Sequence, residues 1–337
     1  MLIFAMVSGL CLGCGSRKNG EASENGTSDK LVVRIGTIEM PNDEGIAKAL
    51  GYFEEEIEAE VELIKFDSGR DVNTALASGS IDFGLEGSSP ATLAIAQDLG
   101  VELIWVHEVL GSVESLVARK ESGITSIEQL KGKKIATPFA STAHFSLLKA
   151  LELAGISSSE VELLDMQTDK IYAAWVNGEI DATYVWQPTL ANLEDAVVLK
   201  TSEDMAYEGY MTSNVEVVRK EFASAHPDIV NAYIRALDRA TKLYEEDEVT
   251  AVKTIADALK LSEEDAKFQM SGSKWLKASE QISKEFLGTS ASKGDIVQNL
   301  YDTAVFLKEQ NSLKELPDIQ VFEAAVNPFY AEEAAKE

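Results

Sequence analysis

The stretch SGSIDFGLEGSSPATLAIAQ, residues 78–97, joins an apolar run to an alanine-rich segment of helical character. The apolar run, with Ile81, Phe83 and Leu85, predicts a strand. Ser is a favoured helix N-cap and Pro suits the first helical position, so Ser89 and Pro90 predict a helix start. A helix start is also a suitable anion site, because its backbone N–H groups point outward. Ser89 therefore either contacts an anion or only caps its own helix.

The same succession returns about 100 residues later along the chain. NGEIDATYVWQP (177–188) repeats the strand-like run followed by a proline, and VELL (161–164) repeats VELI (61–64). LVVRIGT and KGKKIATPF open the two units, and LVARK and VVRK close them. Landmarks in the same order indicate an internal repeat. Each unit alternates strands and helices, which in the first unit we expect at 31–37, 44–56, 61–66, 71–79 and 81–85.

Strands that alternate with helices predict parallel βαβ units, so we expect an α/β fold with two lobes. Ligands of such sheets lie beyond the carboxyl ends of the strands, where residues 84–90, 139–142 and 185–188 are placed. After about residue 221 the pattern becomes helical. We expect that C-terminal region to pack back on the first lobe.

Composition restricts the class of partner. The formal net charge is −27, from 30 Lys and Arg against 57 Asp and Glu, which argues against nucleic acid and anionic lipid as partners of the folded body. With 45% hydrophobic residues the chain can bury a sizeable core. Both cysteines precede residue 15, so we expect no disulfide, thiolate nucleophile or cysteine metal site in the body.

The first residues, MLIFAMVSGLCLGC, resemble a bacterial lipoprotein signal (1–14), with lipid attachment at Cys14. Two features depart from that pattern: Cys11 stands where Leu is usual, and no Lys or Arg precedes the apolar run, which a start codon assigned too late would explain. Residues 15–30 contain one apolar side chain, Ala22, and read as a flexible linker. We therefore expect an extracytoplasmic protein anchored to the outer face of the cell membrane, periplasmic if the cell is Gram-negative.

Five stretches resemble the solute-binding component of taurine and sulfonate ABC importers, over residues 31–330. They are KFDSGRDVNTALASGSID, GSSPATLAIAQ, ATPFASTAHFSLLKALELAGI, AAWVNGEIDATYVWQPT and VVRKEFASAHPDIVNAYIRALD. The resemblance implies a periplasmic-binding-protein fold of type II with two crossover strands as its hinge. Lobe 1 would be 31–114 and 214–337, and lobe 2 would be 115–213. Its implied partners are a small anionic ligand, a permease and the ATPase subunits of the importer, and we expect a monomer.

A sulfonate is an anion with three oxygens, so its site needs several fixed donors. We expect Ser88 and Ser89, with the helix N–H groups behind Pro90, to supply them from one lobe. Ser141 and Thr142, ahead of the helix AHFSLLKALELAG, would supply them from the other. Two opposed helix starts would then clamp one anion.

Taurine also carries an ammonium, which favours an aromatic face or a carboxylate nearby. Trp186 is our candidate for the aromatic wall, and Trp175 is expected in the core, whereas Trp105 fits either place. For the carboxylate we name Glu114, which could equally form a hinge salt bridge, before Glu86 and Glu39. His144 is a further candidate lining residue.

Two positions depart from the family pattern. An Asp is expected where this chain has Asn214, and the first strand continues as Thr37-Ile38 where relatives have Tyr-Gln. With Asn214 an ammonium keeps only a neutral partner there. We therefore expect weak discrimination between taurine and sulfonates of similar size that end in a hydroxyl or methyl group. The ligand is then taurine or another aliphatic sulfonate.

Other functions remain as alternatives. A protein of this fold could bind nitrate, bicarbonate or a carboxylate, and some members of the fold synthesise a pyrimidine precursor. Those enzymes are expected to carry a cysteine-rich iron site, whereas this chain has no cysteine after Cys14. His107, His144 and His226 have no metal-ligand spacing, and no arrangement of nucleophile and base stands out. We therefore expect no catalysis, no metal and no cofactor.

Overall fold

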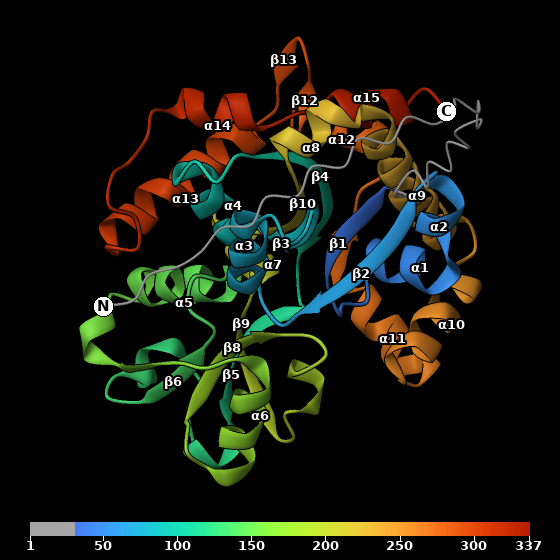
Figure 1. Ribbon diagram of the computed structural model, residues 1–337. Helices are drawn as coiled ribbons and strands as arrows, with labels where there is room; N and C mark the ends of the chain where they lie inside the picture. The colour runs from blue at the N-terminus through green and yellow to red at the C-terminus, as the bar shows by residue number, and fades with distance from the viewer. Residues whose placement is uncertain (1–30) are drawn as a thin grey trace, which may run out of the picture. The chain divides into compact units, whose positions relative to one another are not determined.

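The computed structural model describes residues 31–337, which form one compact unit. The predicted signal at 1–14, the linker at 15–30 and the lipidation site Cys14 lie outside the described residues. Two sheets organise the described chain, as Figure 1 shows.

Lobe 1 is built on a six-stranded sheet in the order β11-β4-β10-β3-β1-β2. Its strands are β1 (Val32–Ile38), β2 (Glu60–Phe66), β3 (Phe83–Gly87), β4 (Val101–Leu110), β10 (Ser213–Arg219) and β11 (Ser273–Trp275). The first unit's strands β1, β2 and β3 are parallel, as predicted, whereas β10 is antiparallel to both β3 and β4. Of the two long strands next to the crossovers, β10 therefore runs against β1, β2 and β3, whereas β4 runs in their direction.

Lobe 2 is built on a five-stranded sheet in the order β7-β6-β8-β5-β9. Its strands are β5 (Glu114–Arg119), β6 (Lys134–Thr137), β7 (Glu162–Asp165), β8 (Ala182–Trp186) and β9 (Ala196–Thr201). Here β6 is parallel to β7 and β8, and β5 is antiparallel to β8 and β9. The two sheets thus share one strand arrangement, and this shared arrangement corresponds to the repeat in the sequence.

The chain passes from the first sheet to the second between Leu110 and Glu114, and returns between Thr201 and Ser213. The boundaries at 114/115 and 213/214, as limits of two bodies that move separately, stay a prediction.

Helices cover both faces of the lobe 1 sheet. On one face Phe83 of β3 stacks on Tyr233, which in turn stacks on Phe53. The opposite face carries Gly84, where an added Cβ would lie 2.5 Å from Val72. The first face is covered by α1 (Asp43–Leu50), α2 (Tyr52–Glu56) and α9 (Pro227–Glu246), and the second by α3 (Gly69–Ser78) and α4 (Ser88–Ala96) (Figure 1).

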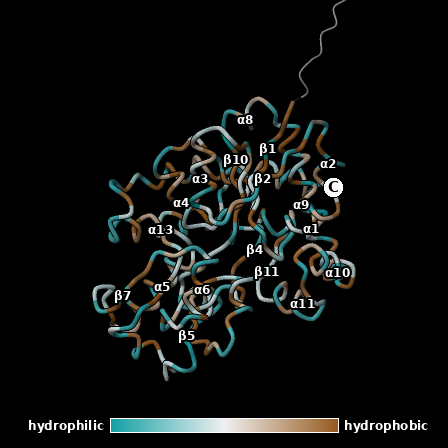
Figure 2. Tube along the Cα trace, turned by 60° about the horizontal axis from the view of Figure 1, so that its bottom comes forward, coloured by the Kyte–Doolittle hydropathy of each residue, from teal (hydrophilic) through white to brown (hydrophobic). Residues whose placement is uncertain are grey.

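The C-terminal region is mostly helical and packs on lobe 1, as predicted. Its helices are α8 (Lys220–Ala225), α9, α10 (Glu248–Leu259), α11 (Glu263–Met270), α12 (Ala278–Gln281), α13 (Ile296–Glu309), α14 (Ile319–Ala325) and α15 (Phe329–Ala334), with the short strands β12 (Gly288–Thr289) and β13 (Ser292–Lys293). Along the helices of Figure 2, hydrophobic and hydrophilic residues alternate within a few positions, the pattern of helices that bury one face. Within residues 31–337, no helix combines the length and the apolar character that crossing a membrane requires.

In lobe 2 the sheet has one core on each face. Leu116 and Tyr184 pack with the inner side of α5 (Thr142–Leu153), and Val117 and Val185 pack with α6 (Thr168–Asn177). The other helical segments of the lobe are α7 (Ser202–Tyr207) and the 3₁₀ turns Lys120–Ser122, Ile127–Leu130, Ser158–Glu160 and Leu190–Asn192.

One residue of α13 reaches the lobe 2 core. Phe306 is buried against Phe145 of α5, with ring centroids 4.9 Å apart and edge to face. Lys149 of α5 lies over the Phe306 ring, with its Nζ 4.5 Å from the centroid. The C-terminal region therefore contacts both lobes.

Several boundaries differ from the sequence prediction: α3 spans Gly69–Ser78 rather than 71–79, and β3 spans Phe83–Gly87 rather than 81–85. The helix expected at 44–56 is interrupted at Gly51, whose φ of 73° lies in the left-handed region that ends helices. The helix expected to start at Ser89 begins at Ser88, with Gly87 as its N-cap and no side-chain cap. Pro90 still fits, because the first four N–H groups of a helix have no intrahelical partner.

Candidate ligand-binding site

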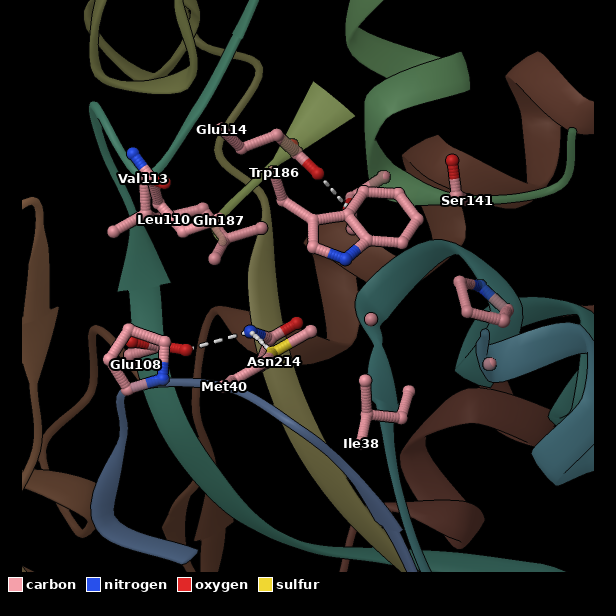
Figure 3. Close-up of a pocket in the computed structure, with 15 residues that line it drawn as sticks. Ile38, Met40, Glu108, Leu110, Val113, Glu114, Ser141, Trp186, Gln187 and Asn214 are labelled. Carbon is pink, nitrogen blue, oxygen red and sulfur yellow. Dashed lines mark hydrogen bonds between the residues drawn. The ribbon is translucent and has the colours of Figure 1, made fainter. Parts of the chain in front are cut away.

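A cavity lies where the carboxyl ends of β1, β3 and β8 meet, between the two sheets. The space between its lining atoms is about 520 Å³, part of it open to solvent. Most of its wall is apolar, from residues that include Ile38, Met40, Leu110, Val113 and Trp186 (Figure 3). The polar side chains that line it are Glu108, Glu114, Ser141, Thr142, Gln187 and Asn214.

Glu114 lies at the start of β5 and is buried, with 1% of its surface exposed. Its carboxylate accepts a hydrogen bond of 2.6 Å from the Thr142 hydroxyl and one of 2.8 Å from the Ser202 hydroxyl. Burial raises the pKa of Glu114 to about 7, and the nearby charge of Glu108 adds to the shift. The alternative of a hinge salt bridge is wrong, because the partners of Glu114 among residues 31–337 are hydroxyl groups.

Glu108, near the end of β4, is a cavity residue that the sequence analysis missed. Its carboxylate accepts a hydrogen bond of 2.7 Å from the Asn214 amide (Figure 3). It accepts another of 2.5 Å from the Ser273 hydroxyl. Burial raises its pKa above the ordinary carboxyl value. A charged residue in the apolar run VELIWVHEVL was the available signal, because buried strands rarely carry unpaired charge.

Asn214 lines the cavity, and its amide nitrogen is engaged by Glu108 and, at 3.2 Å, by the Met40 sulfur. The sequence analysis assumed that Asn at this position leaves an ammonium with a neutral partner alone. That expectation stays a prediction, and the structure adds the Glu108 carboxyl, which stands 2.7 Å from Asn214, as a further group at this position.

Two helix starts of lobe 1 meet at the cavity. Gly87 and Pro90 line it at the start of α4, and Gly69 lines it at the start of α3. An added Cβ at Gly69 would lie 2.6 Å from Pro90, so only glycine permits this close approach. The first turn of α4 has neither a side-chain cap nor an acidic residue, whereas that of α3 has no cap but holds Asp71. The α4 start is therefore an available anion site.

Ser88 and Ser89, the predicted donors of lobe 1, are buried beside the cavity but are not among its lining residues. The Ser88 hydroxyl accepts a hydrogen bond of 3.3 Å from the backbone N–H of Ser213. The Ser89 hydroxyl is buried without a hydrogen-bond partner. A buried hydroxyl without a partner costs free energy, so Ser89 is the more available of the two.

Ser141 and Thr142, the predicted donors of lobe 2, both line the cavity at the start of α5. Their hydroxyls already donate, Ser141 to the carbonyl oxygen of Pro138 at 2.6 Å and Thr142 to Glu114 at 2.6 Å. Ser141 also caps α5 by accepting from the His144 N–H. The two opposed helix starts are thus not equivalent: that of α5 is capped and faces a carboxyl group, and that of α4 is not.

The remaining sequence candidates fall into three places. Trp186 is half-buried and projects into the cavity (Figure 3). His144 stacks on Phe139, at 4.3 Å between centroids, and does not line the cavity; burial lowers its pKa to about 4, so it is neutral near pH 7. Trp105 and Trp175 are core residues. The indole N–H of Trp105 donates a hydrogen bond to Asp43, and that of Trp175 donates one to the Glu194 carbonyl oxygen.

Neither of the two weaker acidic candidates lines the cavity. Glu39 is exposed and pairs with Lys65. Glu86 is buried, and both of its carboxyl oxygens lack a hydrogen-bond partner. Burial, with the nearby charge of Glu216, raises its pKa well above the ordinary value.

A second buried polar cluster lies in lobe 1. His107 contacts Asp43 at 2.7 Å through Nδ1 and Glu216 at 3.1 Å through Nε2, and all three side chains are fully buried. The two carboxyl groups raise the pKa of His107 well above its usual value, although burial opposes them. No group of three or more His, Cys, Asp or Glu suited to a metal ion occurs within residues 31–337.

The two lobes contact each other next to the cavity-lining residue Gly69 and at Gly87. Arg70 of α3 pairs with Asp165 of β7 at 3.0 Å, and Gln167 donates to Ser68 at 3.4 Å. At Gly87 an added Cβ would lie 2.7 Å from the Thr142 methyl group. The structure therefore has its lobes in contact around the cavity.

Comparisons with known proteins agree with the resemblance that the sequence carries. A sequence model of the NMT1/THI5-like family matches residues 45–251. The taurine-binding periplasmic protein of Escherichia coli (strain K12) is 38% identical over 275 residues, which are 80% of this chain and 83% of that protein.

Solved structures agree on the fold. The alkanesulfonate-binding protein of Xanthomonas axonopodis pv. citri bound to MOPS matches with a TM-score of 0.71 at 23% identity, covering 88% of this chain and 97% of that one. The periplasmic aliphatic sulphonate binding protein of Escherichia coli matches with a TM-score of 0.69 at 20% identity, covering 86% and 91%. The predicted two-lobed periplasmic-binding-protein fold is confirmed.

Proposed function

The chain belongs to the NMT1/THI5-like family, and from that premise we propose that it is the solute-binding component of an ABC importer for taurine or a related aliphatic sulfonate. Its taurine-binding relative is a binding protein rather than an enzyme, and so is this chain. In this proposal the protein is extracytoplasmic, binds its ligand between the two lobes and delivers it to a membrane permease.

One observation carries the choice of ligand: a single cavity combines an uncapped helix start with two buried carboxyl groups. The sulfonate would lie at the start of α4, near Gly87 and the unpartnered hydroxyl of Ser89. The ammonium would face Glu108 and Glu114. Figure 3 shows Glu108 and Ser141 on different sides of the cavity. Trp186, which also lines the cavity, is the proposed aromatic wall.

This arrangement revises the roles proposed for the lobe 2 residues. Because Thr142 already donates to Glu114, we propose that it holds the carboxyl group in place rather than binding the sulfonate directly. Asn214 has the corresponding role for Glu108. We keep Ser88, Ser141 and His144 as residues that support the site, since hydrogen bonds or stacking contacts already engage them.

Calorimetric titration of the purified protein tests the ligand class. We expect taurine to bind with a stoichiometry of one, and nitrate, bicarbonate and a simple carboxylate to give no heat of binding. Binding of nitrate or bicarbonate without binding of taurine would overturn the proposal in favour of the alternative anion carriers.

Membrane attachment is proposed through a lipid on Cys14, which lies outside the described residues. Cell fractionation of the Cys14→Ser variant tests this, since loss of the acylation site should move the protein from the membrane fraction to the soluble one. Retention of the variant in the membrane fraction would exclude the lipid anchor while leaving the ligand proposal in place.

A further inference from the structure

We propose that Glu114 releases a proton when a sulfonate with a cationic group enters the cavity, and takes one up when a sulfonate without such a group enters. Glu114 would thereby adjust the charge of the cavity to that of the ligand. The inference rests on the proposed function for the ligand class, and on the geometry of the cavity for the proton.

Two carboxyl groups line the cavity, and His107, whose positive charge acts on one of them, is itself paired with Asp43 and Glu216. Glu108 and Glu114 both line it, and both are at least 97% buried. Their hydrogen-bond partners are neutral, namely Asn214, Ser273, Thr142 and Ser202. No Lys or Arg is among the cavity-lining residues of the described chain. Two buried like charges in one cavity oppose each other's ionisation, so one of the two groups holds a proton more readily than an isolated carboxyl does.

The elements packed around Glu114 carry charged or titratable groups that do not neutralise it. Glu108 on β4 has the same charge, and Tyr184 on β8 contacts Ser202 through its hydroxyl at 3.1 Å. Lys200 on β9 pairs with Glu208 at 2.6 Å, and Asp204 on α7 accepts from Thr201. His144 on α5, which is neutral near pH 7, adds no positive charge. The positive charge that a carboxylate at 114 requires must then come from the ligand.

The balance of the proton can be written explicitly. The pKa of Glu114 is about 7, so near neutral pH about half of the molecules carry the neutral acid. An ammonium beside the group favours the carboxylate, the O–H bond of the acid breaks, and the proton passes to the solvent buffer. At pH 7 about half a proton is released for each taurine bound.

A sulfonate without an ammonium reverses the direction of proton exchange. The added negative charge favours the neutral acid, so Glu114 takes a proton from the buffer, up to about half a proton at pH 7. A protonated Glu114 can also donate a hydrogen bond to the Thr142 oxygen, which frees the Thr142 O–H for the ligand.

Titration calorimetry in buffers of different ionisation enthalpy measures this exchange. The purified protein is titrated at pH 7 with taurine and with 2-hydroxyethanesulfonate, in one buffer of low and one of high ionisation enthalpy. The slope of observed binding enthalpy against buffer ionisation enthalpy gives the number of protons exchanged. We expect slopes of opposite sign for the two ligands. Slopes that are zero or of equal sign for the two would overturn the inference, while the binding itself would leave the proposed function intact.

The Glu114→Gln variant assigns the proton to this side chain. It keeps the shape of the group but cannot titrate, so we expect the slope to fall to zero for both ligands. The matched control is Glu44→Gln, because Glu44 is also buried with a raised pKa but does not line the cavity. The Glu44→Gln control should keep the wild-type slopes. If Glu44→Gln loses proton exchange, or if Glu114→Gln retains it, a group other than Glu114 titrates. If neither sulfonate binds the wild type, the proposed function fails and this inference fails with it.

Discussion

Replacing Glu108 with Gln tests whether a carboxyl group of lobe 1 selects a cationic ligand. The variant keeps the size of the side chain and an oxygen that can accept from Asn214, which in the wild type donates at 2.7 Å. It removes the charge that would face the ammonium of taurine. The fold has little reason to change, because burial already raises the pKa of Glu108 and the neutral form is tolerated.

The size of the effect follows from the difference between charged and neutral hydrogen bonds. A bond between charged groups contributes about 1.5–3 kcal/mol, and a neutral one about 1 kcal/mol. The ammonium should lose about 0.5–2 kcal/mol, which corresponds to roughly two- to thirtyfold weaker taurine binding. For 2-hydroxyethanesulfonate the sign is opposite, because removing a buried negative charge favours an anion that has no cationic group. The affinity of taurine relative to 2-hydroxyethanesulfonate should therefore fall by more than the roughly two- to thirtyfold loss for taurine alone.

Calorimetric titrations of both ligands against wild type and Glu108→Gln measure that ratio. Glu86→Gln is the control, since Glu86 is a buried glutamate of the same lobe that does not line the cavity. An unchanged ratio in Glu108→Gln, with both proteins folded by circular dichroism, would mean that Glu108 does not face the distal group of the ligand.

Three further outcomes are expected. Glu86→Gln should be more stable than wild type by about 1 kcal/mol or more at pH 8, with a smaller difference at pH 5. The raised pKa of Glu86 means that its contribution to stability is fully present below the ordinary carboxyl pKa and is lost as pH rises through the raised value; urea unfolding at the two pH values checks this, and equal differences would refute it. Gly87→Ala should weaken taurine binding tenfold or more without a comparable loss of thermal stability, because the added Cβ would meet Thr142 of the other lobe at 2.7 Å; unchanged affinity would mean that the lobes need not approach there. Arg70→Gln should weaken binding by less than about fivefold, and less at high salt, since the Arg70–Asp165 pair is exposed; a larger effect would indicate a direct contact with the ligand.

Local patterns predicted the repeated architecture. The strands expected at 31–37 and 61–66 are β1 and β2 to within one residue, because apolar runs flanked by helical segments fix both their type and their length. The antiparallel placement of β4 and β10 was not predicted. Strand order depends on contacts between residues far apart in the sequence, such as Val217 with Leu103 and Gly84, and no local pattern encodes them.

The cavity was predicted in its place but only partly in its chemistry. Trp186, Glu114, Ser141, Thr142 and Asn214 line it, since strand ends and helix starts are recognisable from sequence. Glu108 was missed because its position depends on β10 pairing with β4, which brings Asn214 beside it. The use of the Thr142 hydroxyl by Glu114 was likewise not predictable, because it joins side chains 28 positions apart.

Phe306 has a consequence for anyone who wishes to turn this protein into a reporter of its ligand. Its ring is set into the lobe 2 core against Phe145 and beneath Lys149, so we expect it to act as a pivot outside the crossover strands when the lobes move as predicted. Displacements grow with distance from a pivot. A pair of dyes placed on the two lobes near the Arg70–Asp165 ion pair should therefore give the largest ligand-induced change in energy transfer. Dyes placed near Phe306 should give almost none. Shortening this side chain, as in Phe306→Leu, offers a way to tune the response range without altering any residue that faces the ligand.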